Sequence, residues 1–166
     1  MPLSKIKIGT LIEKCAISRG TFYFYFQDIY DLYYQCEQDL ITISTAKITE
    51  VNLSTVRGSY EKPIPVYCEH LKHHEKYKDQ FKVFINGSES RHFEKAFFES
   101  IRLHYGESLS YTSEIEGPVF DYLINFQASG LANLYFTWLS NDCDVPAEGL
   151  AELVCRVMVK GTYPAK

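Results

Sequence analysis

The chain has 166 residues, of which 46% are hydrophobic and 15% aromatic, and it carries a net charge of −4. This length suits one domain or a small head on a larger body, and the hydrophobic content excludes a disordered protein. The longest uncharged stretch, 122–141, is interrupted by polar residues and is too polar for a membrane span. The first residues also do not form a secretory signal. We therefore expect a cytoplasmic protein.

Two short helices are predicted at the start of the chain, over 10–15 and 19–25. Ser18 is a suitable N-cap for the second, because its hydroxyl can accept a hydrogen bond from a free backbone N–H of the first turn. Ile17 and Phe22, on either side of this cap, can close a hydrophobic staple. These local signals predict a turn followed by a helix.

The alternating aromatic residues Phe22, Phe24 and Phe26 also fit a β-strand by period alone. The Ser cap and the helix-favouring run before it favour the helix. A helix here would present several groups that can contact nucleic-acid phosphates or bases. These candidate DNA-binding residues are Ser18, Arg19, Gly20, Thr21, Tyr23 and Tyr25.

The segment 8–26, IGTLIEKCAISRGTFYFYF, resembles the DNA-binding signature of TetR-type transcriptional regulators. The shared pattern is a short helix, a turn ending in Ser, Arg-Gly-Thr-Phe-Tyr and a closing Tyr-Phe. The segment 28–32, DIYDL, resembles the entry to that family's long connecting helix. The resemblance implies an all-α protein, with a helix-turn-helix head over 1–28 and a helical effector-binding and dimerisation body over 29–166.

The head departs from the family pattern at three places. Lys7 stands where the family usually has a polar helix cap, and Ile29 stands where it usually has a Lys, so each removes one expected DNA contact. Family members also begin with a helix before this motif, whereas little precedes Ile6 here. We therefore expect either an incomplete head or a start that lies upstream. The apolar side chains that such a helix would cover are Ile6, Ile8, Leu11 and Ile12.

The rest of the chain is expected to be helical, because its apolar residues recur at helical spacing. The expected elements are a long helix over 29–51, a loop over 52–65, and helices from Pro65 through His74, from about Asp79 to Asn86 and from Ser88–Ser90 to about Gly106. Two closing helices follow, over 118–140 and 146–160, with a turn over 142–145 between them. No run of strands alternating with helices indicates a parallel sheet.

The two closing helices are apolar on more than one face, which predicts that something outside the protomer covers them. The first of them carries the small residues Ala128, Ser129, Gly130 and Ala132 near its middle. Small residues permit close approach of another helix. We therefore expect a two-fold homodimer in which 118–140 and 146–160 of each copy form a four-helix bundle. A single buried central helix in a monomer is the alternative.

A metal site is not expected. His70 and His74 share a helix face as metal ligands can, but no Cys or carboxylate repeats the spacing and Lys72 is close by, so a solvated polar face is the expectation. The five cysteines are widely spaced and include no CxxC pair, which predicts free, mostly buried thiols. The sequence also shows no nucleophile elbow and no phosphate loop, so we expect neither an enzyme nor a cofactor.

Aromatic residues in the body suggest an apolar pocket for a small molecule. The candidate pocket residues are Phe81, Phe84, Phe97, Tyr122 and Phe126, with Phe93 and Phe98 beside them. The resemblance implies that an effector bound in the body changes the spacing of the two heads. The predicted function is a dimeric regulator that binds a near-palindromic operator and acts as a repressor. The alternative is an all-helical small-molecule-binding or interaction protein that has lost DNA recognition.

Overall fold

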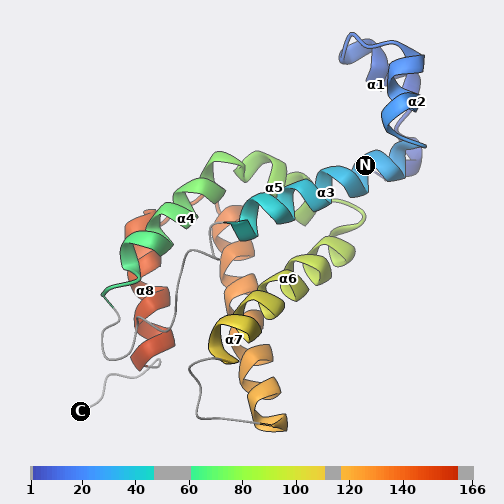
Figure 1. The fold of residues 1–166 in the computed structure, drawn as a ribbon. Coiled ribbons are helices and arrows are strands. Elements are labelled where there is room, and N and C mark those ends of the chain that lie inside the picture. Colours follow the sequence, from blue (N-terminus) through green and yellow to red (C-terminus); the bar gives the residue numbers. More distant parts are fainter. Residues whose placement is uncertain (1, 47–60, 111–116, 161–166) are drawn as a thin grey trace.

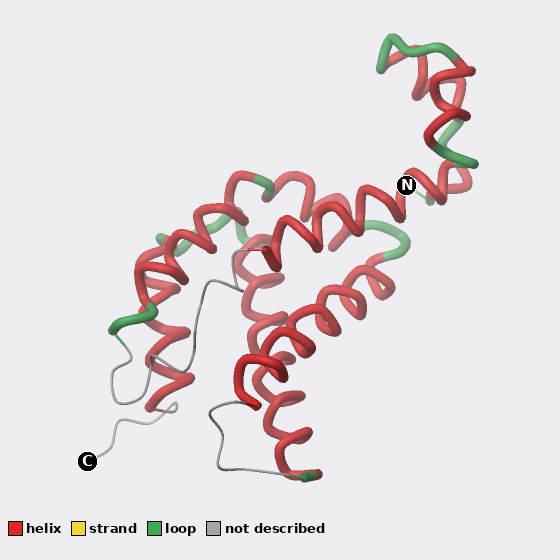
Figure 2. Tube along the Cα trace, in the orientation of Figure 1, coloured by secondary structure: helices red, strands yellow, loops and turns green. Residues whose placement is uncertain are grey.

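The structure is a computed structural model that describes residues 2–46, 61–110 and 117–160. Throughout these ranges the regular structure is helical and no strand is present, which confirms the all-α prediction (Figure 2). The elements are η1 (Leu3–Lys5), α1 (Ile8–Lys14), α2 (Arg19–Tyr25), α3 (Ile29–Ala46), α4 (Ile64–Lys76), α5 (Lys78–Ile85), α6 (Ser90–Ser110), α7 (Pro118–Ser140) and α8 (Ala147–Lys160). In these ranges no helix is both long and apolar enough to cross a membrane.

The short helices α1 and α2 project from one end of the molecule, and α3 runs from them into the body (Figure 1). Leu3 of η1 is buried and η1 packs on α3, so this turn anchors the beginning of the chain. Phe22 is the one buried residue of α2, and α1 has none. The helix pair is therefore held by few buried side chains, and we call residues 2–28 the head.

The body is built from helices that pack in pairs, with α4 along α8 and α6 along α7. The helices α4 to α8 share one core with the middle of α3. Its fully buried large side chains include Tyr67, Leu71, Phe81, Phe93, Phe97, Ile101, Tyr105, Tyr135 and Leu139. Because α3 contributes Leu40 and Ile41 to this core, the helix that carries the head is also part of the body.

The helix boundaries agree with the sequence where local signals are strong. Helix α2 spans the predicted 19–25, and α7 begins at Pro118 behind Gly117, whose φ of 67° is a conformation that glycine adopts without strain. The turn before α8 places Asp142 and Cys143 in the left-handed region. The indole N–H of Trp138 donates to the Val145 carbonyl across it, at 2.8 Å.

Other boundaries differ from the prediction. Helix α1 covers 8–14 rather than 10–15, and α6 continues to Ser110 instead of ending at about Gly106. Gly106 lies against α7, where a side chain would approach the Ile124 methyl group at 4.0 Å. This is an ordinary van der Waals distance, so Gly106 lies within α6 at a position where the packing does not require glycine. The predicted segment 47–51 of the long helix and most of the loop 52–65 lie outside the described residues.

Candidate nucleic-acid interface and interior cluster

Helix α2 begins with a hydrogen-bonded cap. The backbone N–H of Thr21 donates to the Ser18 Oγ at 2.9 Å, and the hydroxyls of Ser18 and Thr21 lie 2.8 Å apart. This confirms the predicted cap at Ser18 and fixes the first turn of α2.

All the candidate DNA-binding residues are exposed on the first turns of this helix. Ser18, Arg19, Gly20 and Thr21 lie on the surface, and Tyr23 and Tyr25 are 53% and 63% exposed. Phe22 faces the other way and its ring contacts those of Tyr23 and Phe26. The structure therefore brings the whole predicted set together on one short helix.

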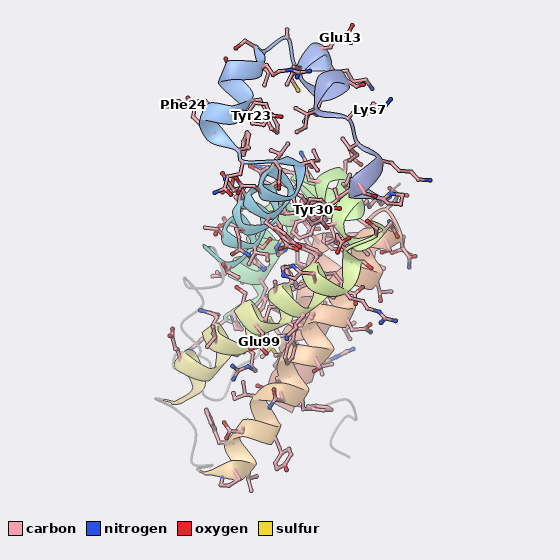
Figure 3. All side chains as sticks on the ribbon, turned by 90° about the vertical axis from the view of Figure 1, so that its right-hand side faces the viewer. Lys7, Glu13, Tyr23, Phe24, Tyr30 and Glu99 are labelled. Carbon is pink, nitrogen blue, oxygen red and sulfur yellow. The ribbon has the colours of Figure 1, made fainter. Side chains whose placement is uncertain are left out.

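Phe24 is an exposed residue of α2 outside the predicted DNA-binding set. It is 80% exposed and its ring meets the Tyr25 ring edge-on at 5.0 Å. Figure 3 shows Phe24 on the outer side of α2, on the side of the head away from Lys7. With Tyr23 and Tyr25 it makes an exposed group of three aromatic rings, and exposed apolar patches mark interaction sites. In the sequence, the position of Phe24 between two tyrosines on the predicted recognition helix could have indicated this exposure.

The departures at Lys7 and Ile29 have structural consequences. Lys7 is the N-cap of α1 and makes no side-chain cap hydrogen bond. Its side chain instead helps to line a hollow of about 280 Å³ with Lys5, Thr10 and Lys14. The head thus gathers three ammonium groups near α1, which suits a polyanionic partner.

Two apolar residues of the head, Ile6 before α1 and Leu11 on it, lie against the body. Ile6 and Leu11 line a cavity of about 300 Å³ with Ile29 and Leu32 of α3 and Phe84 of α5. The head and the body therefore meet across an apolar joint.

A second contact ties α3 to the body. The Glu37 side chain of α3 is fully buried, and its Oε1 accepts a hydrogen bond from Nδ1 of His92 on α6 at 3.1 Å. The Tyr34 ring packs on the same imidazole at 5.0 Å. This link fixes the helix that carries the head and was not found from the sequence, because the two residues are 55 positions apart.

The histidine face of α4 is buried, so the expected solvated face is wrong. His70 and His74 are 0% and 1% exposed, and their rings meet edge-on at 4.2 Å. The Tyr135 ring of α7 lies 5.3 Å from His74 and 5.8 Å from His70. We call His70, His74 and Tyr135 the interior cluster. The signal in the sequence was Tyr67, Leu71 and His74 at core spacing.

The interior cluster lacks hydrogen bonds. Neither ring nitrogen of His70 or His74 has a partner, nor has the Tyr135 hydroxyl. Burial lowers the pKa of His70 to about 3 and holds the pKa of His74 well below its usual range, so both imidazoles are neutral at pH 7. No group of three or more possible metal ligands occurs within the described residues.

The candidate pocket residues separate into two sets. Phe81 and Phe97 are buried beside the interior cluster, 5.2 Å and 6.4 Å from the His74 ring, whereas the buried Phe84 packs on Tyr33 and Phe93 and lines the cavity between head and body. Tyr122 and Phe126 are instead 77% and 80% exposed on α7. The helical period puts them on the opposite face from Ile124 and Ala128, so the five do not line one pocket in the protomer.

The exposed residues of α7 form an apolar surface. Val119, Tyr122 and Phe126 are exposed along one side, and a side chain added at Gly130 would meet no atom within 4 Å. On α8, Leu153 and Val157 are also exposed. We call Val119, Tyr122 and Phe126 of α7 the outer face.

The cysteines are free, as expected, but only Cys155 is buried. Cys15 and Cys36 are exposed, and Cys68 and Cys143 are half-buried. The expectation of mostly buried thiols is therefore wrong, because these residues lie toward the outside of their helices or in a turn.

Comparison with known protein families bears on the body. A TetR family model described as "Transcriptional regulator C-terminal region" matches residues 61–160, more than half of the chain. The chain belongs to this family of transcriptional regulators. No curated protein and no solved structure matches it. The match covers α4 to α8 of the regulator and does not include the head, whose resemblance to TetR-type proteins came from residues 8–26.

Proposed function

We propose that the regulator binds double-stranded DNA through α2 and acts as a repressor at a near-palindromic operator. The observation that carries this proposal is the Ser18-capped helix with Arg19, Thr21 and Tyr23 exposed on it, in a chain whose body belongs to a regulator family. A helix of this kind can enter the major groove with its first residues at the base edges.

The side chains on α2 have different roles in this proposal. Arg19 is the candidate for pairing bidentately with guanine. Thr21, Tyr23 and Tyr25 carry hydroxyls that bind phosphates and fix the register of the helix on DNA. The lysines around the hollow beside α1, Lys5, Lys7 and Lys14, add attraction for the phosphate backbone that weakens with salt.

Phe24 supplies an apolar contact on the same helix. Among the bases in the major groove, thymine offers a methyl group for such a contact. The exposure of Phe24 on the outer side of α2 supports this role. The operator half-site would accordingly contain a thymine next to the base read by Arg19 or close to it.

The DNA-bound form in this proposal is a homodimer through α7 and α8. In the dimer, the outer face of one copy would cover Val119, Tyr122 and Phe126 of the other. Large exposed apolar patches of this kind mark association sites. Two copies related by a two-fold axis would place two α2 helices about one DNA helical turn apart, or a little more. A small effector bound in the body would release the operator by changing that spacing.

The test is a mobility-shift titration of the full chain against DNA selected from a random pool, over a salt series. Specific binding should fall steeply as salt rises. Arg19→Ala should lose discrimination at one base pair, about 1–3 kcal/mol, whereas Arg91→Ala, an exposed arginine on α6, should not. Tyr23→Phe should weaken binding to all sequences alike. Selection of no sequence above random would contradict the proposal.

A second candidate is a helical ligand-binding or interaction protein without DNA recognition. Two observations favour it: α1 has no buried residue, and Lys7 does not cap it. Such a head would bind DNA weakly and without sequence preference. Saturable binding to a selected site that outlasts 100-fold excess of random DNA would exclude this alternative.

A further inference from the structure

The interior cluster combines burial with missing hydrogen bonds. Four imidazole nitrogens and the Tyr135 hydroxyl are buried without a partner. Native cores leave few polar groups in this state, because burying an unpaired donor or acceptor is costly. Two fully buried tyrosines of the same core, Tyr67 and Tyr105, instead pair their hydroxyls with each other. Five of the eight buried unpaired side-chain atoms in the described residues lie where α4 faces α7, and the others belong to Tyr33, Glu37 and Gln127.

The groups in the cluster suit a neutral partner. His70 and His74 are neutral at pH 7 because burial lowers their pKa values, so each offers one donor and one acceptor. The titratable side chains that act on the cluster are His73 and His104 on the His70 side, and Tyr67 and Cys155 on the Tyr135 side. None of the groups that shift these three pKa values is a carboxylate, Lys or Arg, so an ion would lack an opposite charge there.

The surroundings of the cluster suit a flat ring. Phe81 meets the His74 ring edge-on at 5.2 Å, and Phe97 and Tyr135 lie on other sides of it. Aromatic rings prefer edge-to-face and offset contacts with one another. A ligand with one aromatic ring can make such contacts while its polar group reaches the imidazoles.

We infer that the interior cluster of His70, His74 and Tyr135 binds a small neutral aromatic molecule that carries a hydroxyl or ring N–H group, of which phenol is the simplest form. This inference rests on the proposed function, for which it names the effector class. The cluster is at most 1% exposed, so a ligand there must separate α4 from α7. Helix α4 also packs on α3, which carries the head, so this separation would reach the DNA-binding helix.

The test measures phenol, benzene and benzoate binding to the full chain by calorimetry and by imidazole nitrogen NMR. Phenol should bind about tenfold more tightly than benzene, as one or two hydrogen bonds would give, and should shift the ring nitrogens of His70 and His74. Benzoate should not bind there. Tyr135→Phe removes one oxygen from the cluster and His74→Phe removes both polar atoms of one ring. Each should reduce the preference for phenol to about twofold or less.

The matched control is Tyr30→Phe, which removes a hydroxyl from an exposed tyrosine on α3 and should keep the tenfold preference. Equal binding of phenol and benzene, or an unchanged preference in Tyr135→Phe, would overturn the inference. So would unchanged imidazole signals with phenol, since the cluster would then hold only water. Phenol binding by a chain that binds no selected DNA would support the site and overturn the DNA-binding function. Selective DNA binding without phenol binding would overturn the site alone.

Discussion

Replacing His70 with Phe should make the stability of the protein less sensitive to acid. Folding holds the pKa of this buried imidazole at about 3, whereas an exposed His has a pKa of about 6.5. Below pH 6.5 the unfolded chain therefore takes up a proton that the folded chain does not. Keeping His70 neutral therefore favours the folded state fully above pH 6.5. This contribution to the free energy of unfolding is lost as the pH falls toward 3, at about 1.4 kcal/mol per pH unit.

Between pH 7 and pH 5 this linkage amounts to about 2 kcal/mol for His70 alone. The figure depends little on the folded-state pKa, because both pH values lie well above it. Urea unfolding at the two pH values, at one protein concentration, should show that wild type loses about 2 kcal/mol more than His70→Phe. His73→Phe, which changes a half-buried histidine on the same helix, should keep most of the wild-type loss. An equal loss in wild type and His70→Phe would refute the reasoning.

Three further changes test the head and the outer face. Deoxyuridine lacks the methyl group of thymine, so replacing single thymines of the selected operator with it should weaken wild-type binding at one position per half-site. Binding by Phe24→Ala should not change at that position. Equal sensitivity of both proteins would rule out the methyl contact. If the proposed dimer forms through the outer face, Phe126→Glu should make the protein monomeric in analytical ultracentrifugation, whereas Leu103→Glu, at an exposed leucine of α6, should leave the dimer intact; a dimeric Phe126→Glu would place the interface elsewhere. Ser18→Ala should cost α2 about 0.5–2 kcal/mol and accelerate amide exchange in residues 19–25 while exchange in α7 stays slow; unchanged exchange in α2 would mean that the cap contributes nothing.

The sequence alone predicted the features that depend on neighbouring residues. Ser18 caps α2 because the hydroxyl and the N–H that it binds are three positions apart, and Pro118 opens α7 because proline is compatible with the first turn of a helix. The all-α class follows from the same local signals and from helical spacing. The motif of residues 8–26 also indicated the TetR family. The family model that matches residues 61–160 independently assigns the body to the same family.

Tertiary structure decided which face of each helix is inside. Helical spacing places His70 and His74 together, but whether they face solvent depends on α7, which brings Tyr135 against them from more than 60 positions away. Spacing likewise could not separate Phe97, in the core, from Phe126, on the outer face. A periodic pattern fixes which residues share a face, whereas burial is set by the helices that pack on that face, and those contacts join residues far apart in the chain.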